Sequence, residues 1–564
     1  MSATGASATA AGSGPAGRSL SHRQILGVLS GLMLGMFLAA LDQTIVASAI
    51  RTIGDDLHGL SVQAWVTTAY LITATISTPL YGKLSDIYGR KPFFLTAISI
   101  FIIGSAACSF ATSMYQLAGF RALQGLGAGG LFSLALAIVG DIVAPRERAR
   151  YQGYFLAVFG TASVLGPVIG GFFAGADTIL GLSGWRWVFL VNVPIGVLAL
   201  AVVAKVLNVP HLRRDHRLDF LGALCLTVGL VPLLTVAEQG RGWGWTSPRT
   251  ILCGAVGVVG LLAFIAAEAR AKEDALIPLR MFRNRTFSIT AIVGVISGMG
   301  MFGVLVILPL YLQIVRGATP TQAGLLLLPL TAGIMLGSVF SGQLISRTGH
   351  YKIFPILGSL LMIGGAWLLH LVGVDTGFGR TSVFMAVFGL GLGNVLQPIT
   401  LAVQNAMPPR DIGVATSSAT FFRQMGGTLG VAVFLSALFS TVGGNISGAF
   451  RRAAGDPAFR AAVSDPVVAA DPANRQVLAA LHGGTLQGGA LNNTSYLQHL
   501  DRALARPIQT GFAESMDLVF LLAAGVLGLA FLLLLFLPQL PLRTRAASAA
   551  DEPAGEQAVT GPGV

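Results

Sequence analysis

Three charged side chains fall well inside long apolar stretches of this sequence: Asp42, Arg121 and Arg423. A charge at the centre of a bilayer costs at least about 2.5 kcal/mol, so such a residue normally faces a partner or a water-filled cavity. Burial favours the neutral form of a carboxyl group, whereas a nearby guanidinium favours its charged form. An aspartate held between these two influences can take up and release a proton, and Arg423 could bind an anionic group or the carbonyl end of a helix.

The positions of Asp42 and Arg121 along their stretches predict that the two residues can meet. Asp42 lies about eight residues before the end of the stretch 25–50, and Arg121 lies about four residues after the start of the stretch 117–140. A helix rises 1.5 Å per residue, so both side chains fall in the outer half of a membrane. Two interpretations stay open here: a reversible proton carrier, or a permanent ion pair that only fixes the register of two helices.

The amino-acid composition indicates that this chain is a membrane protein. Of the 564 residues, 54% are hydrophobic and 11% are charged, whereas a soluble domain has about 25% charged residues; the mean hydropathy is +0.74. Fourteen stretches approach the roughly 20 apolar residues that a membrane span needs. We therefore expect an all-α polytopic membrane protein with fourteen transmembrane helices. The net charge of +12 does not indicate nucleic-acid binding, because the basic residues lie in short loops between the stretches.

An internal repeat divides these helices into two halves. Gly82 and Gly342 are 260 residues apart, and Gly125 and Gly389 are 264 residues apart. This nearly constant offset predicts two homologous six-helix bundles, and the roughly 60 residues left over accommodate an inserted helix pair. The predicted organisation is a disordered cytoplasmic tail at 1–23, an N-terminal six-helix bundle at 24–210, inserted helices 7 and 8 at 211–275, C-terminal bundle helices 9 to 13 at 276–441, an extracytoplasmic loop at 442–515, helix 14 at 516–541 and a cytoplasmic tail at 542–564.

The distribution of Lys and Arg predicts the orientation of the chain. These residues concentrate in the segments that face the cytoplasm if the N-terminus is inside, and the short loops on the other side carry few of them. Positive residues are enriched on the cytoplasmic side of membrane proteins. We therefore expect both termini in the cytoplasm and the protein in the plasma or inner membrane.

A short charged hairpin between the second and third stretches runs from Gly82 to Lys91 and recurs in weakened form at 342–352. Gly82 and Gly89 allow a tight reversal of the chain, and Asp86, Arg90 and Lys91 keep the hairpin out of hydrocarbon. The fifth stretch carries a second pattern, in which a proline that kinks a helix stands among small residues that allow close packing. This pattern is typical of a gating helix and comprises Gly160, Gly166, Pro167, Gly170 and Gly171.

Polar and aromatic residues inside the stretches are candidates for lining a central cavity. We select Trp65, Tyr70, Gln124, Tyr311, Gln313, Asn394, Gln397, Gln404, Arg423 and Gln424. The sequence shows no metal-binding cluster and no nucleophile with a base, so no enzyme activity, metal or cofactor is predicted.

Taken together, these motifs resemble the major facilitator superfamily, and within it the fourteen-helix drug:proton antiporter group. The resemblance covers roughly residues 24–441 and 516–538. It rests on Leu41-Asp42-Gln43-Thr44-Ile45-Val46, on Trp65 with Tyr70, on the hairpin Gly82 to Lys91, on Arg121-Ala-Leu-Gln124-Gly125, on the Gly160 to Gly171 motif, and on Trp185-Arg186-Trp187 with Asn192 and Pro194.

The resemblance implies multidrug efflux and antibiotic resistance: a proton antiporter of the cell membrane that exports drugs, antibiotics or related amphipathic molecules by alternating access. It assigns Asp86 and Arg90 to locking the cytoplasmic ends of the bundles in the outward-facing state. It assigns Asp42 and Arg121 to proton coupling, and the fifth helix to gating. The implied partners are a small-molecule substrate, protons and the lipid bilayer, with the proton gradient as energy source, and we expect a monomer.

Two features leave alternatives open. The chain lacks acidic residues in helices 10 and 13 and carries Arg423 in the latter, so neutral, zwitterionic and anionic substrates compete with cationic drugs. The long segment 442–515 exceeds an ordinary loop and suits either a membrane scaffold that recruits a partner or a passive insert. A dedicated transporter of a single metabolite is the third possibility.

Overall fold

The chain forms long helices that run side by side, as its apolar stretches predict. The computed structural model describes residues 22–58, 64–143, 145–207, 219–272, 274–408, 411–471, 474–475, 477–478 and 500–542. Thirteen described helical segments are long and apolar enough to cross a membrane. The remaining one of the fourteen predicted spans, the second along the chain, is α2 (Ala64–Tyr88), a 25-residue helix that carries Lys83 and Asp86 near its end. The polytopic all-α class is therefore confirmed.

The N-terminal bundle consists of α1 (His22–Asp56), α2, α3 (Arg90–Ser109), α4 (Met114–Ile142), α5 (Pro145–Ala174), α6 (Trp187–Leu190) and α7 (Asn192–Val206). A two-stranded antiparallel hairpin, β1 (Thr178–Ile179) with β2 (Leu182–Ser183), pairs Thr178 with Ser183 and Ile179 with Leu182. The 3₁₀ turn η2 (Gly184–Arg186) leads from this hairpin into α6.

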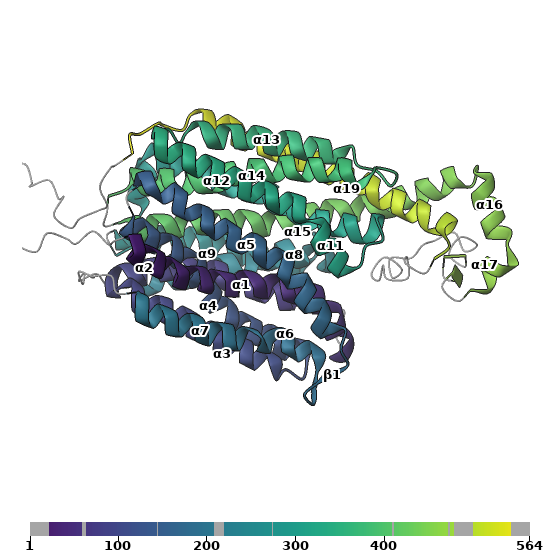
Figure 1. The fold of residues 1–564 in the computed structure, drawn as a ribbon, viewed down its shortest axis with the longest axis horizontal. Coiled ribbons are helices and arrows are strands. Elements are labelled where there is room, and N and C mark those ends of the chain that lie inside the picture. The colour runs from purple at the N-terminus through teal and green to yellow at the C-terminus, as the bar shows by residue number, and fades with distance from the viewer. Residues whose placement is uncertain are drawn as a thin grey trace, which may run out of the picture.

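The C-terminal bundle begins with the 3₁₀ turn η3 (Leu279–Arg283) and continues through α10 (Arg285–Leu310), the π-helical turn η4 (Tyr311–Val315), α11 (Pro320–Leu326), α12 (Leu328–Thr348), α13 (Ile353–His370), α14 (Phe378–Ala406), α15 (Ile412–Ala453), α16 (Pro457–Ser464), α17 (Pro466–Ala470) and α19 (Arg502–Leu535). Figure 1 shows α12, α13 and α14 on one side, α3, α6 and α7 on the other, and α5 and α15 between them.

Local sequence signals set several of these helix ends. The Ser113 side chain accepts a hydrogen bond from Gln116 N at the start of α4, and the Asn284 side chain accepts from Thr286 N and Phe287 N at the start of α10. Such N-caps satisfy backbone donors that have no partner inside the helix. Gly349, with φ of 74°, ends α12 in the left-handed conformation that favours glycine.

The inserted helices α8 (Phe220–Trp243) and α9 (Pro248–Ala271) pack closely against each other, because a Cβ on Gly260 would overlap the Gly229 backbone. The other face of α8 contacts both bundles. An apolar cluster joins Leu226 and Leu230 of α8 with Ile76 of α2 and Phe421 of α15. The inserted pair therefore covers the seam between α2 and α15.

Equivalent glycine contacts confirm the internal repeat. A Cβ on Gly125 would meet the Tyr70 carbonyl, and a Cβ on Gly389 would meet the Leu330 carbonyl. The Tyr70 and Leu330 positions are 260 residues apart, and the two glycines are 264 apart. Close approach of α4 to α2 in the first half thus recurs as close approach of α14 to α12 in the second.

Two predicted helix boundaries are wrong. The thirteenth helix does not end at 441, since α15 runs on to Ala453, and the fourteenth does not begin at 516, since α19 starts at Arg502. The two extensions pack against each other, because a Cβ on Gly511 would meet the Ile446 backbone. They project beyond the body of the molecule and carry α16 and α17 at their end (Figure 1).

Some predictions fall on parts of the chain that the structure does not describe. The predicted tail at 1–23 lies outside the described residues up to residue 21, and the tail at 542–564 does so from residue 543. Most of the segment 472–499 and the connection 208–218 also lie outside them.

Candidate functional site

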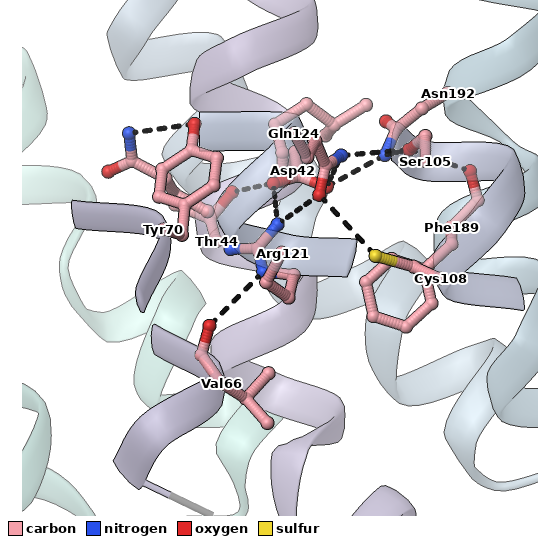
Figure 2. Close-up of polar contacts among 12 residues, drawn as sticks. Asp42, Thr44, Val66, Tyr70, Ser105, Cys108, Arg121, Gln124, Phe189 and Asn192 are labelled. Carbon is pink, nitrogen blue, oxygen red and sulfur yellow. Dashed lines mark hydrogen bonds and ion pairs between the residues drawn. The ribbon is translucent and has the colours of Figure 1, made fainter. Parts of the chain in front are cut away.

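A buried ion pair joins α1 to α4 in the N-terminal bundle. Arg121 Nη1 lies 2.5 Å from Asp42 Oδ2, and the two residues are 1% and 0% exposed. The two charges that the sequence places at similar depth therefore meet. Figure 2 shows this pair at the centre of a polar network contributed by several helices.

Three further polar side chains complete the network around the Asp42 carboxylate. Gln124 Nε2 and Asn192 Nδ2 each donate to Asp42 Oδ1 over 2.9 Å. The same amide nitrogens donate to Ser105 Oγ over 2.8 and 3.0 Å. Arg121 Nη1 also donates to Gln124 Oε1 over 2.5 Å. The network thus links α1, α3, α4 and α7, and it gives the carboxylate three donors in a site without solvent contact.

Tyr70 holds the other side of the Arg121 guanidinium. The Arg121 Cζ lies 4.1 Å from the centroid of the Tyr70 ring, within the range of a cation–π contact. Arg121 Nε donates to the Val66 carbonyl over 3.4 Å. Both contacts come from α2, so five helices of one bundle position the charged pair.

Small residues allow the helices to approach closely enough to form this network. A Cβ on Gly104 of α3 would lie 2.7 Å from the backbone of Gln124. A Cβ on Gly125 of α4 would overlap Thr73 and Tyr70 of α2. Small residues at helix crossings bring backbones together in membrane proteins, and here they bring Gln124 within reach of Asp42.

A second cluster lies at the end of the molecule where α2 ends and α3 begins, which we call the hairpin end. Arg90 Nη1 lies 2.5 Å from Asp86 Oδ1, and Arg90 Nε lies 2.7 Å from Asp141 Oδ2. Asp86 Oδ2 accepts a hydrogen bond of 2.9 Å from Val414 N, in the first turn of α15. A carboxylate near a helix N-terminus is stabilised by the unpaired backbone donors there. The cluster therefore joins the N-terminal bundle to the C-terminal bundle.

Each of the two hairpin glycines has its own structural role: Gly82 allows contact with α15, and Gly89 allows the turn between α2 and α3. A Cβ on Gly82 would overlap the Ser417 side chain of α15, so glycine permits the contact between α2 and α15. Gly89 has φ of 105°, a backbone conformation that side chains rarely adopt. Lys91 points elsewhere: its Nζ donates to the Ala204 carbonyl of α7 over 2.6 Å, within its own bundle.

Further polar contacts join the bundles at the hairpin end. Gln404 Nε2 of α14 donates to the Leu136 carbonyl of α4 over 3.1 Å. Arg148 of α5 donates to Gln404 Oε1 over 3.5 Å. Within the C-terminal bundle, Arg280 and Asp411 form an ion pair of 3.0 Å between the entry to α10 and the entry to α15.

The predicted gating motif of α5 packs on both halves of the molecule. A Cβ on Gly166 would overlap Thr44 of α1, and a Cβ on Gly170 would overlap Ser48 of the same helix. The opposite face meets the C-terminal bundle, with Gly160 against Thr331 and Gly171 against Thr321; Pro167 contacts Gly324. A close-packed helix between the two halves is suited to move with either of them.

The structure separates the ten cavity candidates into groups. Tyr70 and Gln124 belong to the Asp42 network, and Gln404 joins the bundles. The Tyr311 hydroxyl donates to the Gly373 carbonyl over 3.1 Å, and Asn394 Nδ2 donates to Leu390 of its own helix over 2.7 Å. The remaining candidates are Gln397, which is buried, and Trp65, Gln313, Arg423 and Gln424, which are half-buried.

Three residues of these sites were not among the selected positions: Ser105, Asn192 and Asp141. A lone serine or asparagine in an apolar stretch usually makes a packing hydrogen bond, so no sequence signal joined Ser105 or Asn192 to Asp42. Asp141 lies at the end of α4, where an acidic residue is commonly solvated. The only available signal for Asp141 was the excess of basic residues in the neighbouring hairpin.

Known proteins resemble this chain in sequence and in fold. Residues 32–431 match the family model of the Major Facilitator Superfamily. The chain is 37% identical over 420 residues to the multidrug transporter protein MdtP of Bacillus subtilis, covering 74% of this chain and 76% of that protein. It is also 37% identical over 409 residues to multidrug resistance protein 3 of Bacillus subtilis, covering 72% of this chain and 78% of that protein. The solved structure of the proton:xylose symporter XylE bound to 6-bromo-6-deoxy-D-glucose superposes with a TM-score of 0.54 at 15% identity, over 73% of this chain and 89% of that one, which shows a shared fold.

Proposed function

The chain belongs to the Major Facilitator Superfamily, and from this premise we propose that it is a proton-coupled antiporter that exports drugs, antibiotics or related amphipathic molecules across the plasma membrane. Two relatives at 37% identity are named as a multidrug transporter and a multidrug resistance protein. The observation that carries proton coupling is the Asp42 carboxylate, which is fully buried and held by Arg121, Gln124 and Asn192. An intramembrane carboxylate of this kind is expensive and marks a proton or ion pathway.

Asp42 is the proposed proton carrier. When it is ionised, its charge is balanced by Arg121, and the three donors hold the helices of the N-terminal bundle together. When a proton binds, the carboxyl group loses its charge and its attraction to Arg121 falls. The guanidinium then retains Tyr70 and Gln124 as neighbours, and the contacts among α1, α3, α4 and α7 rearrange.

Thr44 provides a direct route from this proton site to the gate. It lies two residues after Asp42 on α1, and its Oγ1 donates to the Ala162 carbonyl of α5 over 3.0 Å. The same threonine side chain occupies the space that Gly166 leaves open. A change in α1 on proton uptake is therefore transmitted to α5, which packs on α11 and α12 of the other bundle.

The hairpin end is the proposed cytoplasmic side, with both termini there, because Lys and Arg concentrate in the segments of that side. Asp86, Arg90 and Asp141 would then hold the cytoplasmic ends of the bundles closed, which leaves the outward-facing state. Release of this lock is required before substrate can enter from the cytoplasm. Alternating access follows from exchange between the two arrangements.

Proton coupling is tested with purified full-length protein in liposomes that contain a fluorescent cationic dye such as ethidium. An imposed pH gradient should drive dye transport by the wild type, and an uncoupler should abolish it. Asp42→Asn keeps the shape of the side chain but cannot ionise. It should therefore lower gradient-driven transport at least about 100-fold, as expected for the loss of an essential residue.

The matched control is Asp177→Asn, because Asp177 is exposed beside the β-hairpin and lies outside the network. It should transport as the wild type does. Unchanged gradient-driven transport by Asp42→Asn would remove Asp42 from the mechanism. Transport of a single metabolite among a panel of dyes and antibiotics would instead indicate a dedicated transporter.

A further inference from the structure

Arg423 is a cation in the middle of a membrane helix without a counter-charge among the described residues. It lies 11 residues after Ile412, the first residue of α15, which corresponds to about 16 Å, or half the thickness of a bilayer core. The side chain is half-buried. It makes no hydrogen bond or ion pair with any other residue in the part of the chain that the structure describes.

Helix packing fixes the backbone position from which the Arg423 side chain extends. A Cβ on Gly298 of α10 would overlap the Arg423 carbonyl, so the α15 backbone at this point rests directly on α10. On the next residue, Gln424 Oε1 accepts a hydrogen bond of 3.2 Å from Thr78 Oγ1 of α2. The amide nitrogen of Gln424 has no described partner and remains available as a second donor.

The helix α2 shows how the three polar regions are spaced. Tyr70 contacts the Arg121 guanidinium, Thr78 contacts Gln424, and Asp86 contacts the start of α15. Successive positions in this series are eight residues apart, or about 12 Å along a helix. Gln424 therefore lies at a level midway between the Asp42 network and the hairpin end, and Arg423 is the adjacent residue of α15.

Four acidic residues of the described helices are already engaged with other partners. Asp42 pairs with Arg121, and both Asp86 and Asp141 pair with Arg90. Glu268 of α9 accepts hydrogen bonds from the backbone nitrogens of Leu276 and Ile277. These acids are committed elsewhere, and an unpaired guanidinium at this depth is costly unless a ligand completes it.

We propose that Arg423 binds the negative group of the transported molecule, so that the substrate class includes amphipathic organic anions with a carboxylate or sulfonate group. The inference rests on the transport function proposed above and adds the charge of the substrate to it. A guanidinium offers paired N–H donors that match a carboxylate or sulfonate. Gln424 adds a neutral donor beside it.

A matched pair of probes isolates the negative charge. 1-Anilinonaphthalene-8-sulfonate and N-phenyl-1-naphthylamine share the same aromatic body, and only the first carries a sulfonate. Binding of each is measured by equilibrium dialysis against purified full-length protein in nanodiscs, with empty nanodiscs as the blank. The variants are Arg423→Gln, Arg423→Lys and Arg451→Gln, the last being an exposed arginine far along the same helix.

Wild-type protein should bind the sulfonate more tightly than the neutral probe. Arg423→Gln should weaken sulfonate binding at least about tenfold and leave N-phenyl-1-naphthylamine binding within about twofold, as expected for one charge-assisted contact. Arg423→Lys should keep part of the preference, and Arg451→Gln all of it. If Arg423→Gln fails to fold, Arg423→Lys provides the test. This variant keeps the charge and loses the paired N–H donors, so its preference for the sulfonate over the neutral probe should fall below that of the wild type.

Equal sulfonate binding by wild type and Arg423→Gln would overturn the proposal, and so would an equal loss of both probes from a variant with unchanged melting temperature. Binding needs no gradient, so this result is independent of proton coupling. A protein that prefers the sulfonate but shows no gradient-driven transport would contradict the antiport function and leave the anion site standing.

Discussion

The two bundles of this protein share a backbone arrangement and differ in the side chains placed on it. In the first half, a Cβ on Gly104 would lie 2.7 Å from the Gln124 backbone; in the second half, a Cβ on Gly365 would lie 2.7 Å from the Phe388 backbone. Gln124 and Phe388 are 264 residues apart, and the same offset places Met385 at the position equivalent to Arg121. One helix crossing therefore supports a charged network in one half and apolar packing in the other.

This difference separates the contacts that hold the fold from the residues that the proposed proton coupling requires. Close helix contacts at small residues recur in both halves and need no charge. The paired charges at this crossing occur in the N-terminal half, and their burial is costly without a functional gain. The comparison indicates that the repeat supplies a common scaffold, and that the residues of the proposed proton coupling belong to one copy of it.

The largest expected effect comes from replacing Arg121 of the N-terminal bundle by methionine, the residue at the equivalent position of the C-terminal bundle. Arg121→Met leaves the Asp42 carboxylate buried without its counter-charge, which should lower stability by about 3–5 kcal/mol, because breaking a buried ion pair strands the remaining charge. The measurement is thermal unfolding of the purified protein in detergent, together with gradient-driven transport.

A double variant keeps this prediction distinct from simple misfolding. Asp42→Leu combined with Arg121→Met replaces the pair by apolar groups, a change that is often neutral for stability. It should restore most of the melting temperature and leave transport absent. A single Arg121→Met variant that melts and transports as the wild type does would refute the assignment of chemistry to this half.

An intermediate effect is expected where the two halves are equivalent. Gly104→Ala and Gly365→Ala each force a methyl group into a neighbouring backbone, and each should cost about 1–3 kcal/mol of stability by overpacking. Transport per folded molecule should fall further for Gly104→Ala, because Gln124 moves away from Asp42. Equal transport losses, or a tolerated Gly365→Ala, would show that the two crossings are not equivalent.

The smallest effect concerns the two hairpins. Asp86→Asn weakens the charged contacts to Arg90 and to Val414 N, and a charged hydrogen bond is roughly twice as strong as a neutral one. We expect a shift of about 1–2 kcal/mol toward the inward-facing state, or about five- to thirtyfold in population. Spin labels on α2 and α15 at the hairpin end report it as a longer distance.

Ser346 is the counterpart of Asp86 in the second hairpin, 260 residues further on, and its hydroxyl donates to the Gln343 carbonyl of its own helix over 2.8 Å. Ser346→Ala removes no charge and should leave the distance distribution nearly unchanged. A larger shift from Ser346→Ala than from Asp86→Asn would reverse the comparison between the two hairpins.

Much of the fold was readable from the sequence because its signals are local or periodic. Apolar length predicts the spans, and the constant glycine offset predicts the repeat. The continuation of α15 was missed because Gly443, Gly444 and Asn445, all poor helix formers, follow closely on the predicted end at 441, although the helix continues to Ala453 by packing against α19. A hydropathy scan detects segments that contact lipid. It does not detect helices that pack against each other outside the membrane.

The candidate site was only partly predictable. Asp42 and Arg121 stand out because a charge in an apolar stretch is costly, and depth along each helix is enough to pair them. Asn192 and Ser105 are neutral and come from helices whose rotation the sequence does not specify. Arg423 was visible for the same reason as Asp42, but its lack of a described partner became apparent only when the surrounding helices were in place.

Proton release on substrate binding tests the central claim most directly. Purified protein in weakly buffered detergent solution is mixed with a saturating transported dye, and the proton count is followed with a pH indicator. If Asp42 exchanges a proton for substrate, the wild type should release protons and Asp42→Asn should release none while still binding the dye. Equal proton release from both proteins would contradict the account.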